Sequence, residues 1–329
     1  MLPRRLFRVL VIALAASTPV GRAELEITTF SGCCDASAAV AVDERHFVVA
    51  DDEDNILRVY KRTGGSPVLQ IDLSSHLGGG KKSDEADLEG GAMVDDMIYW
   101  IGSHGRNAKG KESPMRQRII ATRVSHVRGG LQIEPVSKPY TMLLDDLIAD
   151  ERFAGFGFKQ AATKAPKDKG ALNIEGLTAT PEGHLLIGFR NPIPNGKAIV
   201  LPLLNPRRLF EGNRAQFGEP VTLDLNGLGI RSLGFHEGRC LIIAGHYAEG
   251  GNSRLFEWKP GEPSARLLKD VKLVGLNPEG MSFTEAGGKS EFLVVSDDGT
   301  RSVDGQNCKS LKDPAQKRFR GIVLSLKPQ

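Results

Sequence analysis

Nowhere does the sequence contain an apolar run of the ~20 residues that a membrane-spanning helix needs. Cysteine is scarce, with four in 329 residues, and the spacing of the four fits no zinc-binding pattern such as paired C-x₂-C. The sequence also lacks G-x-S-x-G, typical of many serine hydrolases, and G-x-x-x-x-G-K-[ST], which binds nucleotide phosphates. These absences argue against a membrane-embedded protein, a zinc finger and two large classes of enzyme.

The first 23 residues have the pattern of a secretory signal peptide. Arg4, Arg5 and Arg8 precede a short apolar run at 10–16, and Gly21-Arg22-Ala23 supplies small residues where a signal peptidase cleaves. We therefore predict cleavage after Ala23. The mature protein is expected to be periplasmic or secreted, a monomer, and without a membrane span.

The predicted mature chain is nearly neutral. The full chain has 43 Lys and Arg against 40 Asp and Glu, and four of the arginines lie in the predicted signal peptide, which has no acidic residue. The remaining 39 basic and 40 acidic side chains give a formal charge of −1. Overall charge therefore gives no reason to expect binding to nucleic acid or to a membrane surface.

Glycine is abundant, at 38 of 329 residues against a usual ~7%, and it takes part in a repeat. The sequence Asn173-Ile174-Glu175-Gly176-Leu177 recurs, altered, as Asp87-Leu88-Glu89-Gly90-Gly91 and as Asn277-Pro278-Glu279-Gly280-Met281. An apolar run, a turn and a second apolar run follow each copy. Such strand pairs, repeated at about 45–55 residues, are typical of β-propellers. We predict that each Glu-Gly begins the innermost strand of a blade.

Five such blades begin near residues 36, 90, 176, 232 and 280. The last lacks a fourth strand, and residues 24–30 alternate apolar and polar side chains as a spare strand would. We predict an all-β, five-bladed propeller, a single domain over 24–329, closed by this N-terminal strand. A sixth blade within 126–170 remains open, and a β-sandwich or barrel is the alternative that would not need the Glu-Gly repeat.

One segment departs from the strand pattern. Residues 141–152 (TMLLDDLIADER) space their apolar side chains as a helix does, with Thr141 as a possible N-cap. The segment 159–170, rich in Lys and Ala, is typical of a mobile surface loop. We interpret about 138–170 as an insertion that covers the side or rim of the propeller.

When the blades are aligned, Glu89, Glu175 and Glu279 occupy equivalent positions. The same position holds Arg231 in the fourth blade and Ser37 in the first. Innermost strands surround the central channel, so these side chains are expected to meet at one mouth of it. Three carboxylates repel one another, and an arginine or a bound cation would offset the repulsion. Alternatively, the glutamates are structural and join neighbouring blades through backbone N–H groups.

The residues after each second strand should lie on the same face. They are Asp51–Asp54, Ser103–Asn107, Arg190-Asn191, His246-Tyr247 and Ser296–Asp298. Nearby loops add a basic margin of Lys81, Lys82, Lys109, Lys111, Lys164, Lys167 and Lys169. An acidic mouth with basic margins suits a metal ion that bridges to an anionic ligand, and oxygen ligands favour Ca²⁺ or Mg²⁺. Asp51–Asp54 itself is interpreted as a solvated acidic turn.

Specific roles follow from this arrangement. The predicted ligand-binding residues are Glu89, Glu175, Arg231, Glu279, Arg106, Arg190 and Asn191. The predicted metal ligands, with Ca²⁺ as the candidate cofactor, are Glu89, Glu175, Glu279 and Asp297. His104 and His246 are the candidate general acid and base, or further metal ligands.

The cysteines test the order of the ring. Cys33 and Cys34 precede the first blade and Cys308 lies in a loop of the last, so these segments are neighbours in a closed ring. A disulfide from Cys308 to Cys34, or to Cys33, would fasten the closure. Cys240 lies within a predicted strand and is expected to be a buried free thiol.

Several motifs resemble those of an exported bacterial family, the domain of unknown function 3616 family. The residues that carry the resemblance are 172–177 (LNIEGL), 185–192 (LLIGFRNP), 196–197 (GK), 201–203 (LPL), 229–232 (GIRS) and 277–280 (NPEG). The resemblance covers the mature chain and implies an exported propeller without an established activity. More weakly, the Glu-Gly repeat is similar to phytase-like, esterase-like propellers and to the SdiA-regulated family, which implies calcium and phosphoester hydrolysis.

We therefore expect an exported propeller that binds an anionic small molecule at the channel mouth, through Ca²⁺ where a metal is used. One alternative is a metal-assisted, phytase-like phosphoesterase in which Arg106 or Arg190 holds the phosphate. The other is a scaffold that docks an unknown protein partner and uses the glutamates structurally.

Overall fold

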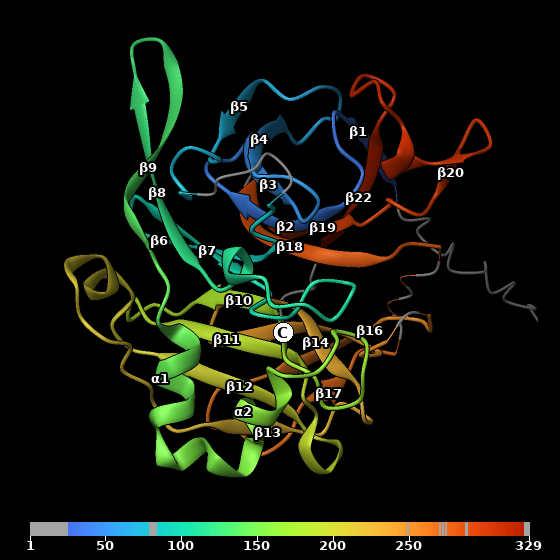
Figure 1. Ribbon diagram of the computed structural model, residues 1–329. Coiled ribbons are helices and arrows are strands. Elements are labelled where there is room, and N and C mark those ends of the chain that lie inside the picture. Colours follow the sequence, from blue (N-terminus) through green and yellow to red (C-terminus); the bar gives the residue numbers. More distant parts are fainter. Residues whose placement is uncertain are drawn as a thin grey trace, which may run out of the picture.

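The computed structural model describes residues 26–78, 84–248, 250–269, 271, 273, 275–286 and 289–325. The predicted signal peptide lies outside these residues, as do Lys81 and Lys82 of the predicted basic margin. Five four-stranded antiparallel sheets form the molecule (Figure 1). The chain therefore folds as a five-bladed propeller, as predicted, and the segment proposed for a sixth blade forms a hairpin and helices instead. No helix of the described residues is long and apolar enough to cross a membrane.

Within each blade the strands pair in order from the innermost strand outward. Blade one has β2 (Ala36–Ala41), β3 (His46–Asp51), β4 (Ile56–Lys61) and β5 (Leu69–Asp72). Blade two has β6 (Leu88–Val94), β7 (Met97–Gly102), β8 (Ile119–Val127) and β9 (Gly130–Tyr140). Blade three has β10 (Asn173–Ala179), β11 (Leu185–Asn191), β12 (Ala198–Leu203) and β13 (Val221–Leu223). Blade four has β14 (Gly229–His236), β15 (Arg239–Gly245), β16 (Arg254–Trp258) and β17 (Arg266–Leu267).

Blade five closes the ring with strands from both ends of the chain: β18 (Pro278–Ala286), β19 (Lys289–Ser296), β22 (Arg318–Ser325) and β1 (Ile27–Ser31). At this seam Phe30 is fully buried and stacks on Phe319, with ring centroids 4.9 Å apart. A disulfide joins Cys34 to Cys308, which are 274 residues apart in sequence. Covalent and aromatic contacts therefore hold the two ends of the chain together.

Every innermost strand has a β-bulge at the same place. Its pairing with the second strand shifts register at Ala36/Ala38, Leu88/Gly90, Ile174/Gly176, Ile230/Ser232 and Pro278/Gly280. The residues that the register skips are Ser37, Glu89, Glu175, Arg231 and Glu279, the set that the sequence alignment places at one phase. A bulge leaves one residue without a ladder partner and redirects its side chain. The repeat in the sequence is thus a repeat of bulges, each presenting one polar side chain.

The glycine after each bulged glutamate allows neighbouring blades to approach closely. A Cβ on Gly176 would lie 2.8 Å from Cγ2 of Ile230 and 3.0 Å from Cγ of Leu233, both in blade four. A Cβ on Gly90 would lie 2.8 Å from Leu177 of blade three. These contacts support the packing role of the glycines.

Gly176→Ala is therefore expected to lower the free energy of unfolding by about 1–3 kcal/mol, because the added methyl group would overpack the contact with Ile230. Gly129→Ala is the matched control, since a Cβ there meets no atom within 4 Å. Denaturant unfolding of both variants measures the difference. Equal stabilities for the two variants would contradict this packing role.

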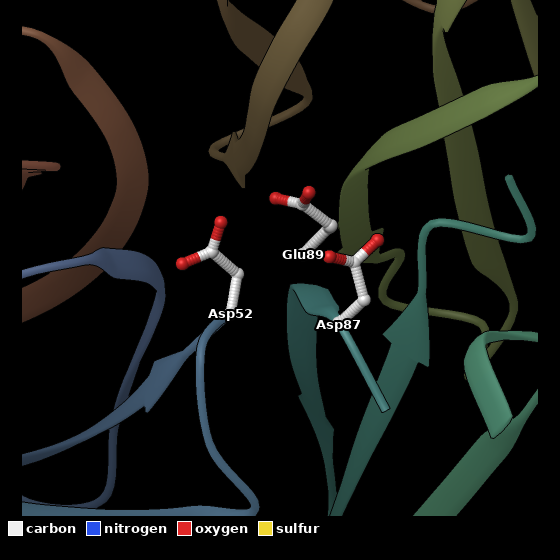
Figure 2. A group of neighbouring side chains, drawn as sticks. All are labelled: Asp52, Asp87 and Glu89. Carbon is white, nitrogen blue, oxygen red and sulfur yellow. The ribbon is translucent and has the colours of Figure 1, made fainter. Parts of the chain in front are cut away.

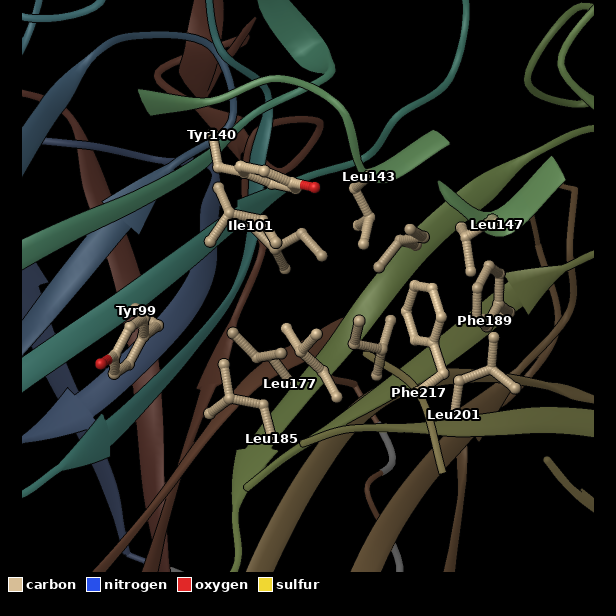
Figure 3. Close-up of a cluster of buried hydrophobic side chains, with 14 of the residues drawn as sticks. Tyr99, Ile101, Tyr140, Leu143, Leu147, Leu177, Leu185, Phe189, Leu201 and Phe217 are labelled. Atoms are coloured by element: carbon tan, nitrogen blue, oxygen red, sulfur yellow. The ribbon is translucent and has the colours of Figure 1, made fainter. Parts of the chain in front are cut away.

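The inserted segment between blades two and three contains α1 (Leu143–Ala149), a 3₁₀ helix (Glu151–Phe156) and α2 (Phe158–Ala161). Met142, not Thr141, occupies the N-cap of α1, and it makes no side-chain capping bond. Part of the segment predicted as a mobile loop is instead α2, with Ala161 buried. Leu143 and Leu147 pack against the side of blade three, among buried side chains that include Leu201, Phe189 and Phe217 (Figure 3).

The remaining short elements lie in loops between strands. They are the 3₁₀ helices Pro114–Arg116, Pro194–Gly196, Pro206–Glu211 and Cys308–Ser310, and the hairpin of β20 (Ser302–Val303) and β21 (Gln306–Asn307). Among these loops, 103–117 matters most for the site: it connects β7 to β8, and it leaves β7 at Gly102, which pairs with Leu88 at the beginning of the innermost strand β6.

Candidate functional site

A cavity of about 530 Å³ lies where the innermost strands β6 and β10 begin. The loops after β3, β7 and β15 and the end of β11 complete its wall, so residues at or after the ends of second strands line this cavity. Its charged lining has six acidic and five basic side chains: Asp52, Glu53, Glu85, Asp87, Glu89 and Glu175, with Lys109, Arg116, Lys167, Arg190 and Lys309. The cavity is therefore dense in charge but close to neutral overall.

Most of these carboxylates have a cationic partner. Arg190 Nη1 donates to Glu175 Oε1 at 2.5 Å. Arg116 donates to Glu85 at 2.6 Å and to Asp87 at 2.9 Å. Lys309 donates to Glu53 at 2.8 Å, which adds a further ion pair in the lining.

Arg231 joins two of the bulged glutamates. It forms an ion pair with Glu279 of blade five, and its Nε lies 3.8 Å from Glu175 Oε2 of blade three. All three side chains are less than 10% exposed. Glutamates of the repeat thus link blades, as the structural alternative held, but through an arginine side chain and not through backbone N–H groups.

Asp52, Asp87 and Glu89 form a separate group. Their ligand oxygens lie within 4.8 Å of one another, and Figure 2 shows the carboxylates turned toward a common space, Asp52 from blade one and the others from blade two. Among the described residues, Asp52 and Glu89 have no side-chain hydrogen bond or ion pair. We call these three residues the carboxylate trio.

The environment of the trio disfavours negative charge. Burial, then the Glu89 carboxylate, raise the pKa of Asp52 well above its usual range. Burial, then Glu175 and Asp87, raise the pKa of Glu89 well above its usual range. Burial raises the pKa of Asp87 to about 6, although Arg116 opposes that change. A bound proton or a cation would relieve this repulsion.

A neutral amide oxygen in the same cavity indicates that the bound species is a cation. Asn173, 8% exposed, lines the same cavity, and its Oδ1 is buried without a hydrogen-bond partner in the described part of the chain. Asp52 Oδ1 is likewise buried and unpartnered there. Carboxylate and amide oxygens without thiolates or imidazoles are the donor set of Ca²⁺ and Mg²⁺. The residues present therefore fit a hard divalent cation.

The departure of blade two from the repeat explains why Glu89 is unpaired. In blade three Asn173 Nδ2 donates to Glu175 Oε1 at 2.9 Å, and in blade five Asn277 Nδ2 lies 3.5 Å from Glu279 Oε1. Asp87 stands at the same place in blade two, two residues before the glutamate. A carboxylate has no N–H to donate, so Glu89 lacks the hydrogen bond that the other glutamates accept.

Of the residues that the sequence predicts for the site, some line the cavity and others lie outside it. Glu89, Glu175 and Arg190 line the cavity. Arg190 is occupied by protein contacts, because its Nε and Nη2 donate to the backbone oxygens of His246 and Ala248.

Asp297 lies outside the cavity lining. Its carboxylate accepts from Asn277 Nδ2 at 2.9 Å and from the backbone N–H of Gly299 at 2.8 Å. Burial raises the pKa of Asp297. Asp297, Arg231 and Glu279, which the sequence predicts as ligand-binding or metal-binding residues, therefore all have partners within the protein.

The two candidate catalytic histidines also lie outside the cavity lining. His104 is 1% exposed, shares a hydrogen bond between Nδ1 and the Gly102 oxygen at 2.8 Å, and burial lowers its pKa to about 4. His246 is exposed, and its ring stacks on that of Tyr247 with centroids 4.7 Å apart. Neither histidine lines the cavity that holds the trio, so this geometry gives no support to an acid or base role for them.

Arg106 and Asn191 hold loops in place. Arg106 donates to Glu112 and to the backbone oxygens of Gly110 and Ala162, which ties the loop after β7 to the inserted segment. The Asn191 side chain bonds to backbone groups of Asp168 and Gly170.

The predicted basic margin divides between two cavities: Lys109 and Lys167 line the first, and Lys164 and Lys169 line a neighbouring one. Lys111 lies outside both linings. Lys309, which sequence reasoning missed, also lines the first cavity.

Sequence reasoning also missed Asp87 and Asn173, and it interpreted Asp52 as part of a solvated turn. The signal for the first two was present in the repeat, because each Glu-Gly has Asp or Asn two residues earlier. Asp52 could not be separated from Asp51, Glu53 and Asp54 by composition. The structure separates them, since Asp54 pairs with Arg58 and Asp51 is 3% exposed.

The fold and this cavity define a five-bladed β-propeller with a charged site at the beginning of its innermost strands. The chain belongs to the family described as protein of unknown function (DUF3616), whose sequence profile matches residues 35–134 and 131–309. No curated protein sequence matches it.

Solved structures with a similar fold are distant. Glutaminyl cyclase of Myxococcus xanthus is 10% identical, with 92% of this chain and 96% of that chain covered and a TM-score of 0.44. A putative oxidoreductase (glucose dehydrogenase) of Thermus thermophilus is 14% identical, with 92% and 100% covered and a TM-score of 0.44. Aldose sugar dehydrogenase of Streptomyces coelicolor, in its PQQ-bound form, is 10% identical, with 92% and 99% covered and a TM-score of 0.43. No activity is transferred from them to this chain.

Proposed function

We propose that the protein binds a divalent cation, Ca²⁺ in the first place, between Asp52, Asp87 and Glu89, and that the bound cation holds an anionic small molecule. The observation that carries the proposal is the convergence of three carboxylates within 4.8 Å, two of them without a partner among the described residues. The unpartnered Oδ1 of Asn173 supplies a further oxygen. Calcium accepts six to eight oxygen ligands, so protein and ligand oxygens would share the ion.

The charge of the cavity makes anion binding depend on the cation. With six acidic and five basic side chains in its lining, the metal-free cavity has a formal charge of −1 when all of them are ionised, which does not favour an anion. A divalent ion reverses the balance and becomes the largest local charge. Lys109, at the exposed rim, then adds to the attraction.

Binding is preferred over the two alternatives. The phosphoesterase alternative assigned the general acid and base to His104 and His246, and both lie outside the cavity lining. A pure scaffold leaves unexplained the cost of burying Asp52 and Glu89, the two carboxylates of the trio without a partner among the described residues. The protein is proposed to act in the periplasm or outside the cell, because disulfides such as Cys34–Cys308 persist in oxidising compartments.

Thermal unfolding of the chelator-treated protein with Ca²⁺, Mg²⁺ or Mn²⁺ tests the proposal. A cation at 100 times its Kd should stabilise the protein by about 2.7 kcal/mol. Inorganic phosphate should add stability only when the cation is present. Glu182→Gln, an exposed change in a turn between β10 and β11, should respond as the wild type does. No stabilisation by any of the three cations would refute the proposal.

A further inference from the structure

A second cavity, of about 600 Å³, adjoins the first. Tyr247 lines both cavities, and the segment 164–170 contributes residues to each. The wall of the second cavity is largely apolar and includes Phe156, Ala161, Pro192 and Ile193. The two cavities therefore differ in chemistry: one is dense in charge, and the other offers apolar side chains on the far side of Tyr247.

Arg190, which lines the charged first cavity, fixes the position of Tyr247. Arg190 donates through Nε to the backbone oxygen of His246 at 2.9 Å and through Nη2 to that of Ala248 at 3.2 Å. Its Nη1 donates to Glu175, which is 2% exposed and lines the first cavity. One guanidinium thus holds the residues on both sides of Tyr247 and anchors them to a buried carboxylate. Arg190 is a positioning residue for the boundary between the cavities.

We propose that the ligand is an anion attached to an aromatic or similarly flat apolar group. Its anionic end is held by the cation at the trio, and its ring crosses Tyr247 into the second cavity. This inference rests on the proposed function, since it assigns the substituent of the same bound anion. Tyr247 is then the residue that determines specificity, because the face of its ring opposite His246, which stacks on the other face, is where a flat group would stack.

The apolar wall gives the expected size of the preference. Burying a side chain the size of phenylalanine contributes enough to strengthen binding by roughly ten- to a hundredfold. A ligand with the same anionic group and a polar substituent gains nothing from Phe156, Ile193 or the Tyr247 ring. The preference should therefore appear as a difference between two phosphomonoesters of equal charge.

Isothermal titration in the presence of Ca²⁺ tests the inference with three probes: inorganic phosphate, glycerol 3-phosphate and 1-naphthyl phosphate. The wild type should bind naphthyl phosphate at least tenfold more tightly than glycerol 3-phosphate. Tyr247→Ala should remove most of that ratio and leave binding of Ca²⁺ and inorganic phosphate unchanged. Tyr247→Phe, which keeps the ring, should behave as the wild type.

A second variant distinguishes a loss of specificity from a folding defect in the loop that holds Tyr247. Ile193→Ala alters the opposite wall and should also reduce the ratio, without affecting binding of the cation. If Ca²⁺ and phosphate bind but both phosphomonoesters bind equally, the inference is wrong and the proposed function stands. If neither Ca²⁺ nor phosphate binds, the proposed function is wrong and the inference fails with it.

Discussion

Replacing Glu89 with glutamine is expected to stabilise the metal-free protein and to remove most of the stabilisation that Ca²⁺ gives the wild type. The Glu89 carboxylate is buried beside Glu175 and Asp87, which together with burial raise its pKa. A neutral amide avoids that cost, so without metal the gain should be on the order of 1–2 kcal/mol. With Ca²⁺ at 100 times its Kd, the variant should lose most of the ~2.7 kcal/mol that binding provides.

The gain in stability that Glu89→Gln gives the metal-free protein should depend on pH. A carboxyl group whose pKa is raised on folding destabilises the protein increasingly as the pH rises above its unfolded-state value, 4.5 here. Glu89→Gln should therefore differ little from the wild type near pH 4 and become relatively more stable toward pH 8. Thermal unfolding in EDTA across this range measures the effect.

Glu175→Gln is the matched contrast, because Glu175 occupies the same bulge position in the next blade. Its carboxylate accepts hydrogen bonds from Arg190 and Asn173, so glutamine leaves the largely buried Arg190 without its charged partner. Breaking such a pair costs about 3–5 kcal/mol, with or without Ca²⁺. If both variants destabilise the metal-free protein alike, Glu89 has the same structural role as Glu175 and the cation site is wrong.

The second large effect is expected from Cys308→Ala. The disulfide with Cys34 closes nearly the whole propeller, since the two residues are 274 positions apart. Losing it should lower the free energy of unfolding by about 2–5 kcal/mol, because the unfolded chain is no longer constrained. Changing Cys308 is preferable to changing Cys34, as adjacent Cys33 could otherwise replace the missing partner.

Cys240→Ala provides the control for this variant. Cys240 is as fully buried as Cys308 but is a free thiol in blade four. Denaturant unfolding under non-reducing conditions should show the larger loss for Cys308→Ala. An equal loss in both variants would mean that the disulfide adds nothing beyond side-chain packing.

The sequence predicts the framework well because its signals are local. Alternating apolar residues and regular turns define the strands, and the unpaired last strand identifies 24–30 as the closure. The repeated Glu-Gly marks equivalent positions at the beginning of the innermost strands, and the structure shows that a β-bulge lies at each of these positions. The contacts of the inserted helix with Phe189 and Phe217 join residues distant in sequence, which periodicity cannot specify.

The site is less predictable, because it depends on which equivalent residues are paired. Alignment makes Glu89, Glu175 and Glu279 look alike. Their difference comes from Arg190 and Arg231, which reach them from other strands, and from Asp87 standing where the other copies have asparagine. His104 lies outside the cavity lining for a local reason: its backbone has φ of 57° and its ring turns back to the Gly102 oxygen at the end of its own strand.

Anomalous diffraction from crystals grown with Mn²⁺ tests the central claim most directly, because the anomalous signal gives the position of the bound ion. The account predicts an anomalous peak between the carboxylates of Asp52, Asp87 and Glu89, and no such peak in crystals of Glu89→Gln. A peak at Glu279 and Asp297 instead, or none in the wild type at saturating Mn²⁺, would contradict it.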